Sequence, residues 1–214
     1  AQLHWAAIGE ALLKNPSVFF LDEPSASFSP QEITRLYGIL RSCADRGACI
    51  IVVTHRIQEV LNFMDTVHIL RNGKTVWDSP IDSTVNAHLL LQEIFGSEQT
   101  EWEEAAEQQD IEPVQRAPAA LLTQPDALSP QDTLQSEKAA RLTVSHVAAV
   151  SSRGVRFSDF SIDVPHGKIT GVVGIKKQGL ELLEYVLVNT ITPDRGTLTF
   201  NGQPLTHIPR KDYA

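Results

Sequence analysis

Apolar residues recur along the chain with two different periods, which predict helices and strands in turn. Spacings of three and four residues predict helices over residues 3–14, 33–44, 57–64, 89–95 and 180–189. Short apolar runs predict buried strands at residues 18–21, 50–53 and 169–173. Alternation of apolar and polar residues predicts half-exposed antiparallel strands at residues 142–150 and 155–164. Because helices and strands follow one another, the pattern indicates an α/β fold.

Turn residues divide these elements. Arg71-Asn72-Gly73 separates two short strand patterns at residues 66–70 and 74–77, and Asn-Gly between strands predicts a β-hairpin. Gly47 and Gly96 follow predicted helices and are expected to end them. A last strand is expected at residues 197–200.

Residues 97–140 differ from the rest of the chain in composition. They hold ten acidic and two basic residues, and this balance of −8 equals the net charge of the whole chain. They contain four prolines and no glycine, so we expect a solvated acidic linker that buries no core. An acidic interaction tail is the alternative interpretation. The linker separates a first segment, residues 1–96, from a second segment, residues 141–214.

Composition excludes several classes of protein. A net charge of −8 argues against nucleic acid as a partner, because phosphate contacts need clustered Lys and Arg. No apolar run approaches the roughly 20 residues of a membrane span. Cys43 and Cys49 have neither a zinc-site spacing nor a disulfide framework, which predicts a reducing compartment.

Two adjacent carboxylates, Asp22 and Glu23, follow the first buried strand and precede Pro24. Open α/β sheets bind ligands at the carboxyl ends of their strands. There the first carboxylate can hold Mg²⁺, directly or through water, and the second can polarise a water that attacks a nucleotide γ-phosphate. The plainer interpretation is that both acids cap a turn.

His55 follows the next buried strand, after a single predicted helix. Two strands joined by one helix are expected to run parallel, so His55 should lie near Glu23. An imidazole there can bind the γ-phosphate and orient the water. The other six histidines have no ligand spacing, and we interpret them as structural.

These motifs resemble those of the ATP-binding-cassette (ABC) ATPases. Leu21-Asp22-Glu23-Pro24 resembles their Walker B motif, residues 25–30 their D-loop, and Val53-Thr54-His55-Arg56 their switch-histidine loop. Ser29-Pro30 resembles the sugar and nucleoside importers, in which one chain carries two ATPase halves. The resemblance implies that Asp22 holds Mg²⁺ through water, Glu23 and His55 are catalytic, and Ser29 communicates across the ATPase dimer.

The second segment resembles the beginning of another ATPase half, with a degenerate Walker A loop. Gly174 and Gly179 have the spacing of a phosphate-binding loop, but Leu180 and Glu181 stand where Lys and Ser or Thr are required. Lys176 and Lys177 lie inside the loop and are candidates for phosphate contacts. A closed structural turn is the alternative use of this loop.

The order of the motifs suggests two incomplete domains, because Walker B precedes the Walker A-like loop here. The first segment is expected to be the end of one ATPase half, and the second segment the start of the next, in a piece of a longer protein. One alternative remains open. The segments could pair as a single, circularly permuted domain whose Walker A and Walker B strands are adjacent.

The resemblance implies the ATPase subunit of an importer for a sugar, nucleoside or related solute. Its cofactors would be ATP and Mg²⁺. Its partners would be membrane permease subunits, a solute-binding protein and a second ATPase half, at the cytoplasmic face of the plasma membrane. We expect the chain alone to be inactive. A non-catalytic regulatory or scaffold module is the main alternative, and a cassette ATPase acting on ribosomes or DNA is another.

Overall fold

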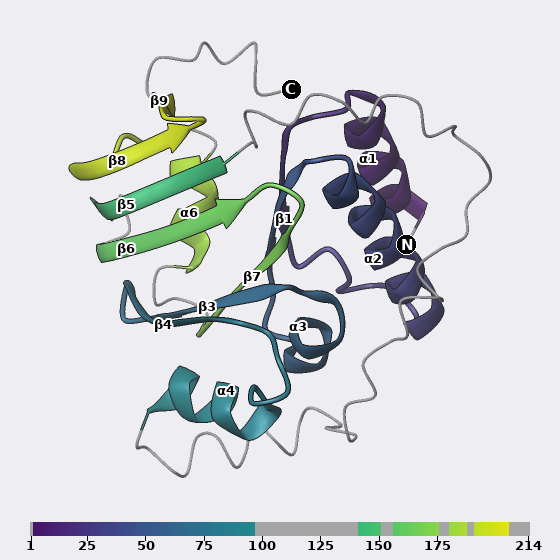
Figure 1. Cartoon of the computed structure of the whole chain (residues 1–214), viewed down its shortest axis with the longest axis horizontal. Helices are drawn as coiled ribbons and strands as arrows, with labels where there is room; N and C mark the ends of the chain where they lie inside the picture. Colours follow the sequence, from purple (N-terminus) through teal and green to yellow (C-terminus); the bar gives the residue numbers. More distant parts are fainter. Residues whose placement is uncertain (1, 97–140, 151–155, 176–179, 188–190, 206–214) are drawn as a thin grey trace.

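The computed structural model describes residues 2–96, 141–150, 156–175, 180–187 and 191–205 (Figure 1). The first segment forms four helices and four strands: α1 (Gln2–Leu13), β1 (Val18–Asp22), α2 (Pro30–Asp45), β2 (Cys49–Val53), α3 (Ile57–Phe63), β3 (Thr66–Arg71), β4 (Lys74–Pro80) and α4 (Ala87–Phe95). The described part of the second segment adds β5 (Arg141–Val150), β6 (Arg156–Pro165), β7 (Ile169–Gly174), α6 (Leu180–Leu187), β8 (Arg195–Phe200) and β9 (Gln203–Pro204). These elements confirm the α/β class and the predicted alternation. Residue 155 of the predicted strand and residues 188 and 189 of the predicted helix lie outside the described residues.

Strands of both segments share one nine-stranded sheet in the order β1-β2-β7-β3-β4-β6-β5-β8-β9. The second segment supplies β7, which lies between β2 and β3 of the first segment and runs parallel to both. Strands of both segments therefore lie in one sheet, as the alternative of a single, circularly permuted domain predicts. That alternative also predicts that the Walker A and Walker B strands are adjacent, and the structure differs on this point. The Walker A-like strand β7 and the Walker B-like strand β1 are not adjacent, because β2 lies between them.

The predicted hairpin is confirmed between β3 and β4, which pair antiparallel. Asn72 has a φ of 52° and Gly73 a φ of 71°, and a two-residue turn with both angles positive suits the twist of a hairpin. A Cβ at Gly73 would lie 2.1 Å from the carbonyl oxygen of Arg156. Glycine therefore allows both the turn and its close approach to β6, where Ser158 donates its N–H to the Gly73 carbonyl at 2.8 Å.

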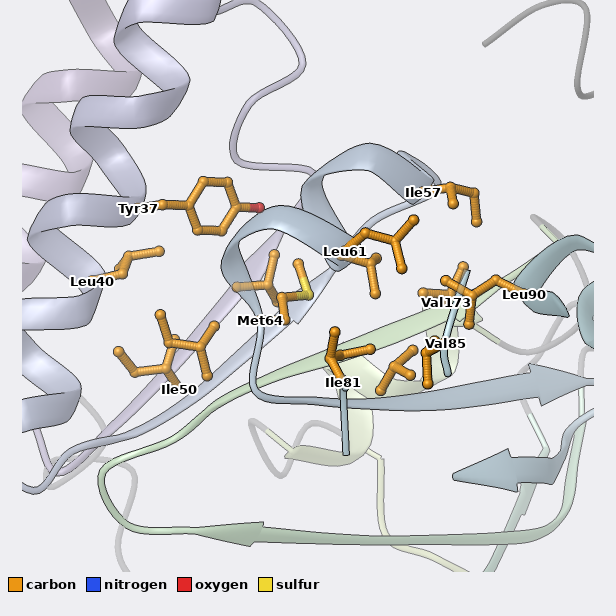
Figure 2. Packing of buried hydrophobic residues seen from close by; sticks show 14 of the residues in the cluster. Tyr37, Leu40, Ile50, Ile57, Leu61, Met64, Ile81, Val85, Leu90 and Val173 are labelled. Carbon is orange, nitrogen blue, oxygen red and sulfur yellow. The ribbon is translucent and has the colours of Figure 1, made fainter. Parts of the chain in front are cut away.

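Two apolar clusters cover opposite faces of the parallel strands. The first joins α2, α3 and α4 to the sheet, and Figure 2 shows Leu40, Ile50, Met64 and Val173 within it. The second joins the other face of β2 and β7 to α6 and to the antiparallel strands β5, β6 and β8. Each fully buried aliphatic side chain contributes roughly 1.5–3 kcal/mol, so both clusters stabilise a sheet built from both segments.

Burial follows the predicted patterns. All five residues of β2 and all six of β7 are buried, as expected for parallel strands covered on both faces. In β5 and β6 buried residues largely alternate with partly or fully exposed ones. None of the described helices combines the length and apolar character that crossing a bilayer requires.

Candidate functional site

The carboxyl ends of β1, β2 and β7 lie at one edge of the sheet, because the three strands are parallel and in register. Asp22 pairs with Val53, and the backbone N–H of Glu23 donates to the Val53 carbonyl at 2.9 Å. Glu23 has a φ of 46°, so the chain leaves the strand in a sharp turn at this residue. Asp22 is exposed at the edge, whereas the Glu23 side chain is only 16% exposed.

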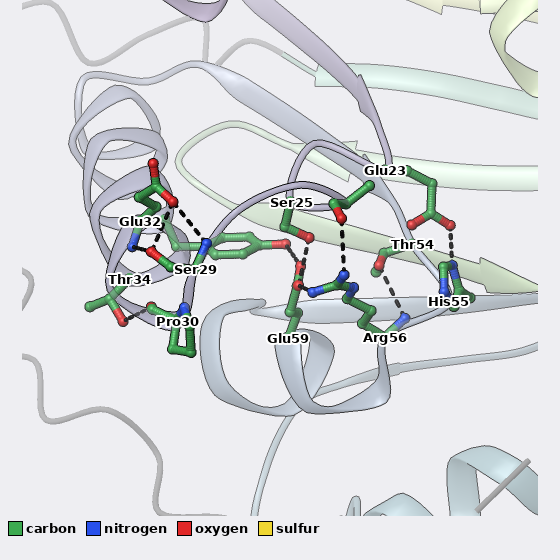
Figure 3. Close-up of polar contacts among 12 residues, drawn as sticks. Glu23, Ser25, Ser29, Pro30, Glu32, Thr34, Thr54, His55, Arg56 and Glu59 are labelled. Carbon is green, nitrogen blue, oxygen red and sulfur yellow. Dashed lines mark hydrogen bonds and ion pairs between the residues drawn. The ribbon is translucent and has the colours of Figure 1, made fainter. Parts of the chain in front are cut away.

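The structure brings Glu23 and His55 into direct contact, as the sequence predicts (Figure 3). Oε1 of Glu23 meets Nδ1 of His55, whose side chain is 49% exposed. Nδ1 is thus the ring nitrogen that faces the carboxylate, and Nε2 lies on the other side of the imidazole.

The second carboxylate oxygen of Glu23 has a different environment. Oε2 is buried, and no described residue donates a hydrogen bond to it. A buried oxygen without a donor is costly. Oε1 of Glu23 thus contacts His55, whereas Oε2 is shielded from solvent and has no donor among the described residues.

The sequence analysis missed a third acidic residue of this region, Glu59 on α3. Its side chain is buried and accepts hydrogen bonds from Ser25 and Tyr37. The signal in the sequence was a carboxylate inside the apolar helix pattern of residues 57–64, four residues after His55.

Ser29 lies at the N-terminus of α2 and caps that helix. Its Oγ accepts the backbone N–H of Glu32 at 3.4 Å, and Glu32 Oε2 accepts the backbone N–H of Ser29 at 2.8 Å. Hydrogen bonds from the backbone and then the hydroxyl of Ser29 hold the pKa of Glu32 below its ordinary value. The described contacts of Ser29 are thus a capping box.

Gly174 ends β7 at the same sheet edge as Glu23 and His55. A Cβ there would lie 2.5 Å from the Leu70 carbonyl oxygen, so the close approach of β3 requires glycine at this position. The other three candidates in the loop, Lys176, Lys177 and Gly179, lie outside the described residues.

A magnesium site would need few protein ligands. Within the described ranges, no group of three or more His, Cys, Asp or Glu side chains is suited to hold a metal ion. Mg²⁺ on a nucleotide is commonly held by one or two carboxylates together with phosphates and water. The exposed carboxylate of Asp22, beside Glu23, fits that demand.

Comparison with known proteins confirms the resemblance drawn from the motifs. The chain is similar to ATP-binding subunits of ABC importers, and its mixed α/β architecture with a curled sheet fits an ABC ATPase domain. No protein-family model matches the chain, and no solved structure matches it.

Individual relatives import sugars or nucleosides. The ribose import ATP-binding protein RbsA of Bacillus licheniformis is 26% identical over 196 residues, which are 92% of this chain and 33% of that protein. The glucose import ATP-binding protein TsgD13 of Haloferax volcanii is 27% identical over 95% of this chain and 32% of its own length. The nucleoside import ATP-binding protein NupA of Lactococcus lactis is 24% identical over 94% of this chain and 35% of its own length. The chain thus spans about a third of the length of these relatives.

Proposed function

We propose that the chain belongs to the ATP-hydrolysing subunit of an importer for a sugar, a nucleoside or a related small solute. The observation that carries this proposal is the environment of Glu23, one of whose oxygens contacts His55 while the other is buried with no donor among the described residues. Because no described donor stabilises its charge, Oε2 can take up a proton from a water molecule that reaches it. The names of the relatives, which are import ATP-binding proteins for ribose and for nucleosides, support the same class of protein.

In this proposal Glu23 is the general base. It accepts a proton from a water molecule, whose oxygen attacks the γ-phosphorus of ATP and displaces ADP. His55 binds the γ-phosphate through its imidazole, which Glu23 orients at Nδ1. Asp22 would hold Mg²⁺, and the ion would neutralise phosphate charge.

We propose further that the two segments derive from two ATPase halves, with residues 97–140 as the acidic linker. Residues 1–96 would be the end of the first half and residues 141–214 the start of the second. The extent of the similarity supports this arrangement, since it covers 92–99% of the chain but about a third of each relative. The remaining second half, permease subunits at the cytoplasmic face of the membrane and a solute-binding protein are the proposed partners. Ser29 would then face the other ATPase half.

The Walker A-like loop is the weak part of the site. Gly174, Lys176, Lys177 and Gly179 are proposed phosphate contacts, but Leu180 lacks the charge of a P-loop lysine. The next residue, Glu181, would repel phosphate. We therefore expect the chain alone to bind MgATP weakly and to hydrolyse it slowly or not at all.

The test is a pair of measurements on residues 1–214. Binding of MgATP is measured by calorimetry, and single-turnover hydrolysis is followed with protein in excess over γ-labelled ATP. Loss of the general base in Glu23→Gln should leave binding intact and slow any hydrolysis by about 100-fold or more. Glu10→Gln is the control, because it removes an exposed carboxylate of α1 that pairs only with Lys14 among the ion pairs of the described residues.

The second candidate function is a non-catalytic regulatory or scaffold module. Leu180 and Glu181 at the loop favour it, because they replace the groups that hold phosphate and Mg²⁺ in a P-loop. If MgATP binds to neither the chain nor Glu23→Gln at millimolar concentration, the hydrolase proposal fails for this chain and the scaffold function takes its place.

A further inference from the structure

Glu59 is a buried carboxylate whose two oxygens are both bound. Its side chain is 5% exposed. Oε1 accepts the Ser25 hydroxyl at 2.6 Å, and Oε2 accepts the Tyr37 hydroxyl at 2.7 Å. Arg56 adds an ion pair, with Nη1 lying 3.5 Å from Oε1. A carboxylate removed from water is tolerated when its oxygens are satisfied and its charge is paired, and both conditions hold here.

Two of the partners of Glu59, Ser25 and Arg56, belong to the loops that carry Glu23 and His55. Ser25 is two residues beyond Glu23, and Arg56 is the residue after His55. Figure 3 shows Glu59 beneath both loops, between Ser25 and Arg56. The carboxylate therefore connects the end of β1 to the end of β2 through side chains.

A second connection runs directly between the loops. Arg56 donates from Nη2 to the Ala26 carbonyl at 3.4 Å, and its backbone N–H donates to the Thr54 hydroxyl at 3.1 Å. Thr54 is itself fully buried. The backbone of Arg56 is thus bound within the His55 loop. Its guanidinium binds both the Glu23 loop, at Ala26, and Glu59.

Tyr37 attaches the same carboxylate to α2. Its ring is 1% exposed and stacks on Phe63 with ring centroids 4.5 Å apart. Burial, and then the negative charge of Glu59, raise the pKa of Tyr37 far above its ordinary value, so the phenol remains a donor. Tyr37 therefore binds Glu59 from the helix side, opposite to the loops.

We propose that Glu59 is the positioning residue of this site, holding the loop of Glu23 against the loop of His55 through Ser25 and Arg56. The catalytic meaning of that geometry rests on the proposed ATP hydrolysis. The positioning itself does not, because it rests on the contacts of Glu59 and Arg56 with the two loops.

The experiment compares two single hydrogen-bond deletions on the same carboxylate. Ser25→Ala removes the bond toward the Glu23 loop, and Tyr37→Phe removes the bond toward α2. The imidazole ¹⁵N signals of His55 are recorded in the ¹⁵N-histidine-labelled full chain and assigned with His55→Gln. Glu23→Gln defines the signal positions when the carboxylate contact at Nδ1 is lost.

We expect Ser25→Ala to shift the His55 signals most of the way toward those of Glu23→Gln, and Tyr37→Phe to leave them near wild type. Ser25→Thr keeps the hydroxyl and should restore the wild-type signals. Arg56→Met keeps the length of the side chain, removes its charge and should reproduce the shift. It also tests the proposal if Ser25→Ala fails to fold, because the Arg56 side chain is partly exposed.

Equal shifts in Ser25→Ala and Tyr37→Phe, or no shift in either, would overturn the proposal and make Glu59 a packing anchor only. The readout needs no ATP. A chain that binds no nucleotide but shows the expected shifts therefore retains the positioning role and loses the proposed hydrolysis. A chain that hydrolyses ATP but does not show these shifts retains the proposed hydrolysis and loses the positioning role of Glu59.

Discussion

Arg41 on α2 and Asp65, the residue before β3, form a two-point ion pair. Nη1 of Arg41 lies 3.0 Å from Oδ1 of Asp65, and Nη2 lies 2.8 Å from Oδ2. Oδ2 also accepts the backbone N–H of Ile169, the first residue of β7, at 2.8 Å, although the two residues are 104 positions apart. Arg41 donates in addition to the Gly167 carbonyl at 3.4 Å. One carboxylate and one guanidinium thereby bind the second segment to the first.

Replacing Asp65 by asparagine should lower the free energy of unfolding by about 2 kcal/mol, because hydrogen bonds to charged groups of this kind are lost. The side chains of Arg41 and Asp65 are 23% and 16% exposed, so solvent screens the pair only in part. Urea unfolding at neutral pH measures the effect. Asp45→Asn is the matched control, since Asp45 pairs with the same arginine at 3.7 Å and is 66% exposed. If Asp45→Asn lowers the free energy of unfolding as much as Asp65→Asn does, the prediction that Asp65 contributes more than an exposed ion pair is wrong.

Gly171 tests whether β7 belongs to the sheet of the first segment in solution. A Cβ at this position would lie 2.3 Å from Sδ of Met64, so Gly171→Val should destabilise the protein by about 1–3 kcal/mol through overpacking. Hydrogen exchange of β2 should speed up as well, although β2 lies in the other segment. Val150→Thr, an exposed change on β5, should leave exchange in β2 unchanged. Unaltered exchange of β2 in Gly171→Val would mean that the segments fold separately.

We expect the protein to lose stability in mild acid because His68 on β3 is buried. Burial lowers the pKa of His68, and the negative charges of Asp78 and Asp163 only partly oppose that shift. The unfolded chain, with an ordinary histidine pKa of about 6.5, therefore takes up a proton before the folded protein does. Stability should fall as pH drops below about 6.5, by no more than about 1.4 kcal/mol per pH unit for this one group. Urea midpoints at pH 8 and pH 5.5 measure it, and His68→Gln should lose less than wild type. Equal losses in both proteins would assign the pH dependence to other groups.

Ser29 makes a prediction about the helix it caps. Ser29→Ala removes the acceptor for the N–H of Glu32 and should lower the free energy of unfolding by about 1 kcal/mol. Ser29→Thr keeps a hydroxyl and should stay within about 0.5 kcal/mol of wild type. Thermal unfolding of the three proteins checks this, and an alanine variant as stable as wild type would rule out the capping contribution.

The sequence predicts the elements of this fold better than their partners. The apolar runs of β2 and β7 indicate strands buried on both faces, which the structure confirms. They do not specify a neighbour, because a run of Ile and Val fits any central position in a parallel sheet. The neighbour is selected by contacts of β7 with residues outside the strands, such as the hydrogen bond from Ile169 to Asp65 and the fit of Gly171 against Met64.

The sequence likewise predicts some features of the candidate site and not others. The proximity of Glu23 and His55 follows from two parallel strands and one connecting helix, and the sequence predicts it. Glu59 escaped prediction because its bonds reach Ser25 and Tyr37 across 34 and 22 positions. A Ser three residues before Glu32 is the sequence signature of a capping box at Ser29. The resemblance to a D-loop instead led to the prediction that Ser29 contacts the other half of a dimer.

The position of β7 has a consequence for synthesis. As the chain leaves the ribosome, β2 and β3 are complete long before Ile169 appears, so both present a strand edge with no parallel partner. Pairings between such distant residues form slowly, and open edges invite association with other chains. β7 can take its place between β2 and β3 only once the second segment has been synthesised, so the centre of the sheet closes late although its two flanking strands are made early.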